Sequence, residues 1–403
     1  ECGVFLLREA RTGNNRYLKE MNKAIILDLI RTTKGISRKA LADRTGLSPT
    51  ATGAIVKELL KEQYIREVGE GKSSGGRKPV MLEINPDSYY AFGFDIDMRF
   101  IYTVVLDITG KVHYVKKREN SSPLTPDEAV GQIGQTFDAV VSELGIDKAR
   151  ILGAGISVPG MLDINTRRIY LAPNLGWINV DIRENLANRL NIPVYLDNEA
   201  MCSAFCENWL GICRGVEDFI CINIESGIGA GIFVRGKIYR GYNGSAGEVG
   251  HISVDENGPV CKCGNVGCLE TMASIKAMAN RYRELKAEDD PAVSGRTIDQ
   301  NFEALLQGAR AGDRECLGIF REAAVSLGKA IGYLINALNP QTIVIGKKFP
   351  MYADLVLDEI KKTAAKTALS HLADNCSIVP SSFGEDSSAL GAAIIPIRKI
   401  FGK

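Results

Sequence analysis

The chain begins with a region of helical periodicity. Between residues 17 and 63, apolar side chains recur every three or four positions, as in amphipathic helices. Glycines at 35 and 46 interrupt the pattern, which therefore predicts three helices rather than one. Residues 1–15 show no period and are expected to form a flexible arm. The predicted helices cover residues 17–33, 38–45 and 49–63. In the first, Leu18, Met21, Ile25 and Leu29 lie on one face, with Ile26 and Ile30 beside them.

The third predicted helix and the segment after it have the pattern of a winged helix-turn-helix. Two strands, residues 64–68 and 80–84, flank a glycine-rich basic loop that suits a DNA-contacting wing. In the helix, we expect Ala51, Ile55, Leu59 and Leu60 to face inward. The alternative is an ordinary helical module with a solvated basic loop. The predicted DNA-contacting residues are Ser48, Thr50, Thr52, Lys57, Lys72, Arg77 and Lys78.

From residue 89 onward, the pattern changes to strands and occurs twice. Each series has three short strands, then helices, then a buried strand. The first series has strands at residues 91–96, 100–107, 111–116 and 150–157, and the second at 219–224, 230–235, 237–240 and 342–345. This repetition predicts two related lobes, and a cleft between lobes is the default place for a ligand.

Four potential metal ligands lie close together in the second series. His251, Cys261, Cys263 and Cys268 have the spacing H-x9-C-x-C-x4-C, and the glycines between them permit tight turns. Three thiolates and one imidazole are a ligand set of closed, structural zinc sites, so we expect bound Zn²⁺. The alternative is two buried thiols and a disulfide.

The segments around these ligands resemble the signature of the ROK family, which contains repressors and sugar kinases. The matching motifs are G-x-x-G-x-A-G-E-x-G-H at residues 241–251 and C-x-C-G-x-x-G-C-x-E at residues 261–270. The resemblance implies an α/β chain, in which a winged helix-turn-helix precedes a two-lobed, actin-like and ribonuclease-H-like sugar kinase fold. The implied divisions are an arm (1–15), the DNA-binding module (16–86), the first lobe (87–200), the second lobe with the zinc and sugar-binding loop (201–385), and a C-terminal helix packing back on the first lobe (386–403).

The same resemblance implies which side chains contact a sugar. Hydroxyl groups need paired acceptors and amides, and the matching segments supply both. If one ring nitrogen of His251 binds zinc, the other can reach a sugar hydroxyl. For Asn174 and Asn198, the alternative is a role in turns. The implied sugar-binding residues are Asn174, Asn198, Glu199, Glu248, His251 and Glu270.

The segments that bind ATP phosphates in kinases of the family are altered in this chain. The D-x-G-G-T motif is replaced by residues 95–99, which include Asp97 and Met98, and the second phosphate loop contains Glu225. A third glycine cluster reads Gly346, Lys347, Lys348, and the catalytic Asp position holds Glu199. Because phosphate binding needs close backbone approach and positive charge, we expect no catalytic residue and no phosphotransfer.

Composition adds bounds on location and partners. A net charge of +1 means that basic DNA-binding surface must be local, and no apolar run approaches the roughly 20 residues that span a bilayer. Ten cysteines without a secretory signal favour a reducing cytoplasm. The interpretation is a cytoplasmic, sugar-responsive repressor of the xylose-repressor branch, binding operator DNA as a homodimer or a dimer of dimers. The alternatives are an active ATP-dependent sugar kinase with a DNA-binding module, and a zinc-stabilised interaction protein without a small ligand.

Overall fold

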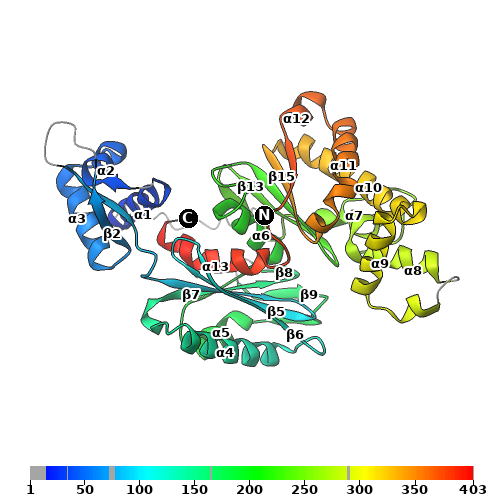
Figure 1. Cartoon of the computed structure of the whole chain (residues 1–403), viewed down its shortest axis with the longest axis horizontal. Coiled ribbons are helices and arrows are strands. Elements are labelled where there is room, and N and C mark those ends of the chain that lie inside the picture. Colours follow the sequence, from blue (N-terminus) through cyan, green and yellow to red (C-terminus); the bar gives the residue numbers. More distant parts are fainter. Residues whose placement is uncertain (1–14, 34, 72–77, 164–165, 288–290, 403) are drawn as a thin grey trace, which may run out of the picture.

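The computed structural model describes residues 15–33, 35–71, 78–163, 166–287 and 291–402. A small N-terminal unit lies at one end of the elongated molecule, and two α/β lobes form the rest (Figure 1). The predicted arm falls almost wholly outside the described residues. The N-terminal unit contains α1 (Asn15–Thr32), β1 (Ile36–Ser37), α2 (Arg38–Thr45), α3 (Pro49–Lys61), β2 (Ile65–Glu70) and β3 (Val80–Ile84).

The N-terminal unit is a winged helix in which α3 presents one face to the core. The three strands form an antiparallel sheet in the order β1-β3-β2. Ser37 and Ser48 cap α2 and α3, as their positions predict. Thr52, Ile55, Val56 and Leu59 of α3 are buried, at the i, i+3, i+4, i+7 spacing of one helical face. The prediction that Thr52 faces outward is therefore wrong.

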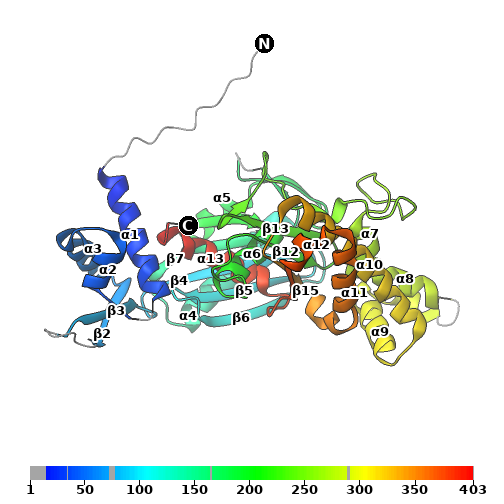
Figure 2. The same ribbon diagram turned by 90° about the horizontal axis from the view of Figure 1, so that it is seen from above.

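The buried face of the first helix is shifted from the centre of the predicted apolar face toward Ile26 and Ile30, which were predicted beside it. Ile26, Leu27 and Ile30 are buried, whereas Leu18, Met21 and Ile25 are exposed. Figure 2 shows α1 running lengthwise beside α2 and α3, with one end close to the C-terminus of the chain. The C-terminal half of α1 is buried because it packs on both its own unit and the neighbouring lobe.

The first lobe is built on a five-stranded sheet in the order β11-β7-β4-β5-β6. Strands β4, β5 and β6 form the predicted antiparallel meander, and β7 and β11 add in parallel. Helices α4 and α5 cover one face through a core that includes Phe92, Phe94 and Phe137. The elements are β4 (Tyr90–Ile96), β5 (Phe100–Asp107), β6 (Val112–Glu119), α4 (Pro126–Glu143), β7 (Ile151–Val158), α5 (Ile182–Leu190) and β11 (Val194–Asn198), with a small sheet of β8 (Met161–Leu162), β9 (Ile169–Ala172) and β10 (Trp177–Val180).

The second lobe repeats this topology, as the repeated strand pattern predicts. Its sheet has the order β14-β13-β12-β15-β16, again an antiparallel meander extended by two parallel strands. The elements are α6 (Glu199–Trp209), β12 (Phe219–Ile224), β13 (Ile228–Val234), β14 (Lys237–Tyr239), α7 (Leu269–Ala273), α8 (Ile275–Lys286), α9 (Ile298–Arg310), α10 (Arg314–Leu338), β15 (Thr342–Lys347), α11 (Ala353–Thr367), α12 (Ser370–Asp374) and β16 (Ser377–Pro380).

The last helix, α13 (Ser387–Ile400), packs against the first sheet and against α6. Glycines on both sides make this close contact possible. A Cβ at Gly93 of β4 would lie 2.0 Å from the Ala389 carbonyl oxygen, and one at Gly391 would lie 1.6 Å from the Cys202 carbonyl oxygen. Helix α13 therefore joins the first sheet to α6 at backbone distance. No helix in the described ranges is long and apolar enough to cross a bilayer.

Candidate functional site

The four predicted metal ligands meet at one point of the second lobe. Their ligand atoms all lie within 4.8 Å of one another. The Cys261 sulfur is 3.7 Å from His251 Nδ1, and the Cys263 and Cys268 sulfurs are 3.7 Å apart. Tetrahedral zinc with Zn–S bonds of about 2.3 Å requires sulfurs about 3.8 Å apart, so the arrangement fits such an ion. All three cysteines are free, which disagrees with the disulfide alternative.

The ligand loop takes its shape from its glycines and from backbone hydrogen bonds. Gly264 has φ +96°, and its N–H donates to the Cys261 carbonyl at 2.9 Å. Gly267 has φ +63°, and a Cβ there would lie 1.6 Å from the Asp255 carbonyl oxygen. These turns require glycine, and they bring Cys261, Cys263 and Cys268 back to His251 from a short loop.

Two carboxylates lie beside the metal ligands. Glu270 accepts a hydrogen bond from the Ile228 N–H at 3.3 Å. Glu248 begins the 3₁₀ turn that carries His251. Desolvation by the surrounding protein raises the pKa of Glu248, the His251 charge lowers it, and the Glu270 charge raises it. Since His251 turns Nδ1 toward Cys261, its Nε2 remains for another partner.

The remaining predicted sugar contacts come from the first lobe and the start of α6. Asn198 caps α6: its Oδ1 accepts from the Ala200 N–H at 2.8 Å, and its Nδ2 donates to the Gly160 carbonyl at 2.7 Å. Glu199 is the first residue of α6. Asn174 is exposed in the turn between β9 and β10. These two bonds give Asn198 a role in a turn, as the alternative interpretation expects. They also orient Glu199, the next residue.

The altered phosphate loops converge on one buried lysine. Lys347, at the end of β15, is 3% exposed and lies between the lobes. Its Nζ is 3.1 Å from Asp95 Oδ2 of β4 and 4.0 Å from Glu225 Oε2, and it donates to the Glu385 carbonyl at 3.1 Å. Asp95 also accepts from the Ser157 hydroxyl at 2.5 Å. The third glycine cluster is thus replaced by an internal ion pair that joins the two lobes.

Neighbouring charges extend this ion pair across the cleft. Lys348 Nζ is 2.7 Å from Asp299 of α9, and Asp299 also pairs with Arg99 of the first lobe. Burial raises the pKa of Glu199 to about 8 and that of Glu225 to about 7, although the Lys347 charge lowers both. Around neutral pH, Glu199 is therefore mostly protonated and Glu225 is partly protonated, beside the Lys347 ammonium group.

A second ion pair between the lobes was not predicted from the sequence. Arg240, after β14, donates to both oxygens of Asp197 on β11, at 2.9 and 2.5 Å. Asp197 is 3% exposed. Asp197 directly precedes the candidate ligands Asn198 and Glu199. This position could have indicated the ion pair, since a buried carboxylate needs a partner.

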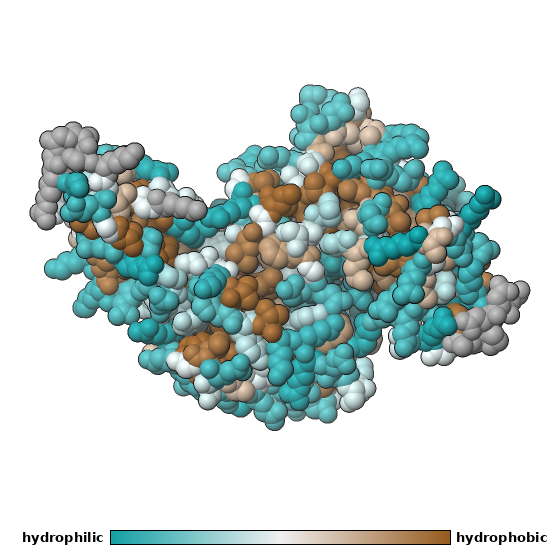
Figure 3. Space-filling view, in the orientation of Figure 1, coloured by the Kyte–Doolittle hydropathy of each residue, from teal (hydrophilic) through white to brown (hydrophobic). Residues whose placement is uncertain are grey.

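The winged helix presents most of the predicted DNA contacts at its surface. Ser48, Thr50 and Lys57 are exposed along α3, and Lys78 is exposed at the start of β3. Thr52 is fully buried, and its hydroxyl has no hydrogen-bond partner among the residues that the structure describes. Lys72 and Arg77 lie outside the described residues. The face in Figure 3 is mostly hydrophilic over the described part of this unit, whereas hydrophobic side chains gather nearer the middle of the molecule.

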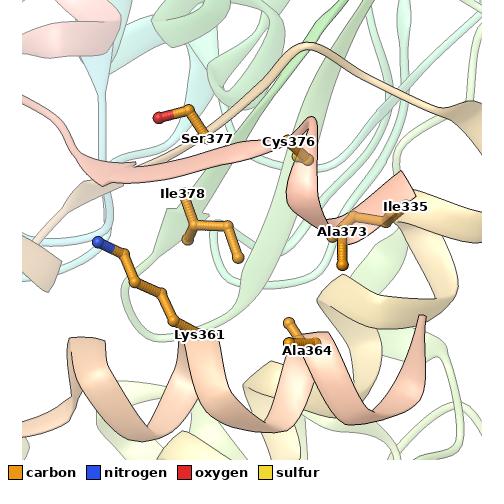
Figure 4. A pocket seen from close by; sticks show the side chains of 8 residues that line it. Ile335, Lys361, Ala364, Ala373, Cys376, Ser377 and Ile378 are labelled. Atoms are coloured by element: carbon orange, nitrogen blue, oxygen red, sulfur yellow. The ribbon is translucent and has the colours of Figure 1, made fainter. Parts of the chain in front are cut away.

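A hollow of about 310 Å³ lies between α10, α11, α12 and β16, away from these residues. Figure 4 shows Ile335, Ala364, Ala373 and Ile378 lining it, with Lys361 at one side. The lining lacks the paired acceptors that a sugar requires. The cleft between the lobes therefore remains the candidate sugar site.

A winged helix joined to two lobes of repeated topology defines a DNA-binding regulator built on a sugar kinase fold. The chain belongs to the ROK family: the ROK family pattern matches residues 92–399, and a winged helix-turn-helix DNA-binding pattern matches residues 25–66.

Similar proteins include both regulators and kinases. The chain is 34% identical over 358 residues to the xylose repressor of Caldicellulosiruptor bescii, covering 87% of this chain and 88% of the relative. A ROK family transcriptional regulator, described as a homologue of the E. coli MLC protein, superposes with a TM-score of 0.83 at 24% identity, covering 95% and 96%. A ROK family glucokinase from Streptomyces griseus, solved with glucose and AMPPNP, gives 0.63 at 28% identity, covering 75% and 98%.

Proposed function

We propose that the protein is a sugar-responsive transcriptional repressor that binds operator DNA and does not phosphorylate its effector. The observation that carries this proposal is the combination of a winged helix with a ROK domain whose nucleotide region contains the Lys347–Asp95 ion pair. A phosphate in this region would meet Glu225 and Asp97 rather than backbone N–H groups. Similarity to a xylose repressor supports the repressor class and makes D-xylose the first effector to test.

The proposed sugar site uses the polar groups at both sides of the cleft. Glu248, His251 and Glu270 provide acceptors and a ring nitrogen from the second lobe, and Glu199 provides a carboxyl group from the start of α6. Asn198 orients Glu199 through its cap, and Asn174 reaches the ligand from the β9–β10 turn when the cleft closes. A sugar that contacts both sides favours the closed cleft, because only closure satisfies all of its hydroxyl groups.

The metal cluster supports this site structurally. We propose that it binds Zn²⁺, which when present would be held by His251, Cys261, Cys263 and Cys268 and would fix the loop that carries Glu248. The donor set and the 3.7 Å separations support zinc. Its role is to position residues rather than to react.

We also propose that residues 16–86 form the DNA-binding module, 87–200 and 201–385 the two lobes, and 386–403 the helix that returns to the first lobe. The module would act in the cytoplasm as part of a homodimer, because two recognition helices on a twofold axis read a palindromic operator. Closure of the cleft would change the distance between the two α3 helices. The expected result is release of the operator when sugar binds.

The test measures operator binding with and without sugar. A duplex operator selected from random-sequence DNA is titrated with the protein, alone and with saturating D-xylose or D-glucose, and sugar binding is measured separately by calorimetry. We expect sugar to weaken operator binding about 5-fold or more, within the typical range of allosteric coupling. Glu270→Ala should bind operator equally well in both conditions. Tight sugar binding with unchanged operator affinity would refute the mechanism, and sugar phosphate formed from ATP would favour the kinase alternative.

A further inference from the structure

Helix α6 connects the proposed sugar site to the DNA-binding module. Its first residue is Glu199, and its last residue, Trp209, lies about 15 Å further along the axis. The indole of Trp209 and the ring of Phe401, which follows α13, have centroids 5.4 Å apart. These two rings form an aromatic platform at the far end of α6.

Arg31 of the DNA-binding module contacts this platform. The guanidinium of Arg31, in the last turn of α1, lies 4.0 Å from the Trp209 ring centroid and 5.5 Å from that of Phe401. Asp28, one turn earlier, holds the guanidinium at 2.8 Å. The Arg31 side chain is only 12% exposed, so this cation–π contact is largely shielded from water and stronger than an exposed one.

Hydrogen bonds join α6 and α13 near both ends. The Ser203 hydroxyl lies 3.1 Å from that of Ser387 and 2.9 Å from that of Ser388. Ser388 also donates to the Glu199 carbonyl at 3.2 Å, directly beside the proposed sugar site. At the other end, Arg398 donates to Asn208 at 3.0 Å. Because hydrogen bonds join the two helices near both ends, we expect a displacement of Glu199 to be transmitted along α6 to Trp209.

We propose that α6 is the lever that transmits sugar binding to the DNA-binding module, and that the contact of Arg31 with Trp209 and Phe401 is where it acts. This inference rests on the proposed function and identifies the residues through which sugar binding affects the DNA-binding module. When the cleft closes on a sugar, movement of the α6–α13 pair displaces the platform, and α1 and the winged helix follow. Arg31 is thus a coupling residue that touches neither sugar nor operator.

The test separates coupling from binding. Arg31→Gln and wild type are compared by calorimetry with D-xylose and D-glucose, and by operator titration with and without the sugar. We expect Arg31→Gln to bind sugar and operator individually within 2-fold of wild type, and the sugar effect on operator binding to fall from about 5-fold or more to below 2-fold. Arg31→Lys, which keeps a cation over the rings, should restore part of the response.

Lys23→Gln is the matched control. Lys23 is also on α1 and is similarly shielded, but it pairs with Glu58 and Glu62 inside the winged helix. It should keep the wild-type ratio of operator affinities, whatever its effect on basal affinity. A wild-type ratio in Arg31→Gln with sugar binding intact overturns the lever. Absence of a sugar response in wild type overturns the proposed function and the lever with it.

Discussion

Replacing Lys347 with methionine should strongly destabilise the protein, and the loss should depend on pH. The substitution keeps the length of the side chain but removes the ammonium that faces Asp95 at 3.1 Å in a nearly solvent-free position. Removing one partner of a buried ion pair typically costs about 3–5 kcal/mol, because the other charge stays buried without compensation. That is a large part of the total free energy of unfolding, about 5–15 kcal/mol for most proteins.

The pH dependence follows from Glu199 and Glu225. Burial raises their pKa values from 4.5 to about 8 and about 7, so the folded protein binds these protons more tightly than the unfolded chain. The free energy of unfolding therefore falls as pH rises from about 4.5 to about 8. Lys347 opposes both shifts, so its removal raises both pKa values further and extends the fall to higher pH. The variant should lose less stability at pH 6, where both carboxyl groups are protonated.

The assay is chemical denaturation of wild type and Lys347→Met at pH 6 and pH 8. We expect a loss of about 3–5 kcal/mol at pH 8 and a smaller loss at pH 6, where the two glutamates are protonated. Lys362→Met is the control, because this exposed lysine pairs with Glu359 at 3.6 Å, and such surface pairs contribute little. An equal loss at both pH values would refute the coupling of Lys347 to the two glutamates.

Further predictions concern the metal, the DNA surface and the chemistry. Purified protein should contain about one zinc per chain by elemental analysis, and Cys263→Ser should lower both the zinc content and the stability. Lys57→Ala and Lys78→Ala should each reduce the salt dependence of operator binding by roughly one unit of slope. An unchanged slope would mean that the replaced lysine contacts no phosphate. Thr52→Val should be neutral or stabilising in thermal unfolding, since it removes a buried hydroxyl without a partner. Incubation with magnesium, ATP and a sugar that binds should give no sugar phosphate, and turnover near ~1 per second would contradict this.

Local patterns predicted the features that depend on residues close together in the chain. The His251, Cys261, Cys263 and Cys268 spacing is short, and these side chains do converge. The repeated strand pattern led to two sheets with the same strand order, because a meander followed by buried strands has few ways to pair.

Features set by distant segments could not be derived in this way. The apolar positions of α3 are compatible with two overlapping faces, and packing in the folded unit selected the one that contains Thr52 and Val56. Similarly, α1 turns Ile26 and Ile30 inward because a neighbouring lobe covers them. The Lys347–Asp95 pair joins residues 252 positions apart, so only the tertiary fold brings them together.

The same pair also explains how a sugar kinase fold can respond to sugar alone. The Lys347 ammonium is occupied by Asp95 and by the Glu385 carbonyl, so it is not available to a phosphate group. Diverting it to a nucleotide would leave Asp95 buried and unpaired, at a cost of about 3–5 kcal/mol. A nucleotide with an intrinsic Kd of 1 μM would then bind with a Kd of about 0.2–5 mM, since each 1.4 kcal/mol changes Kd tenfold. In the proposed function, the sugar is then the main ligand of the cleft, and the energy of closure would act on the DNA-binding module rather than on phosphoryl transfer.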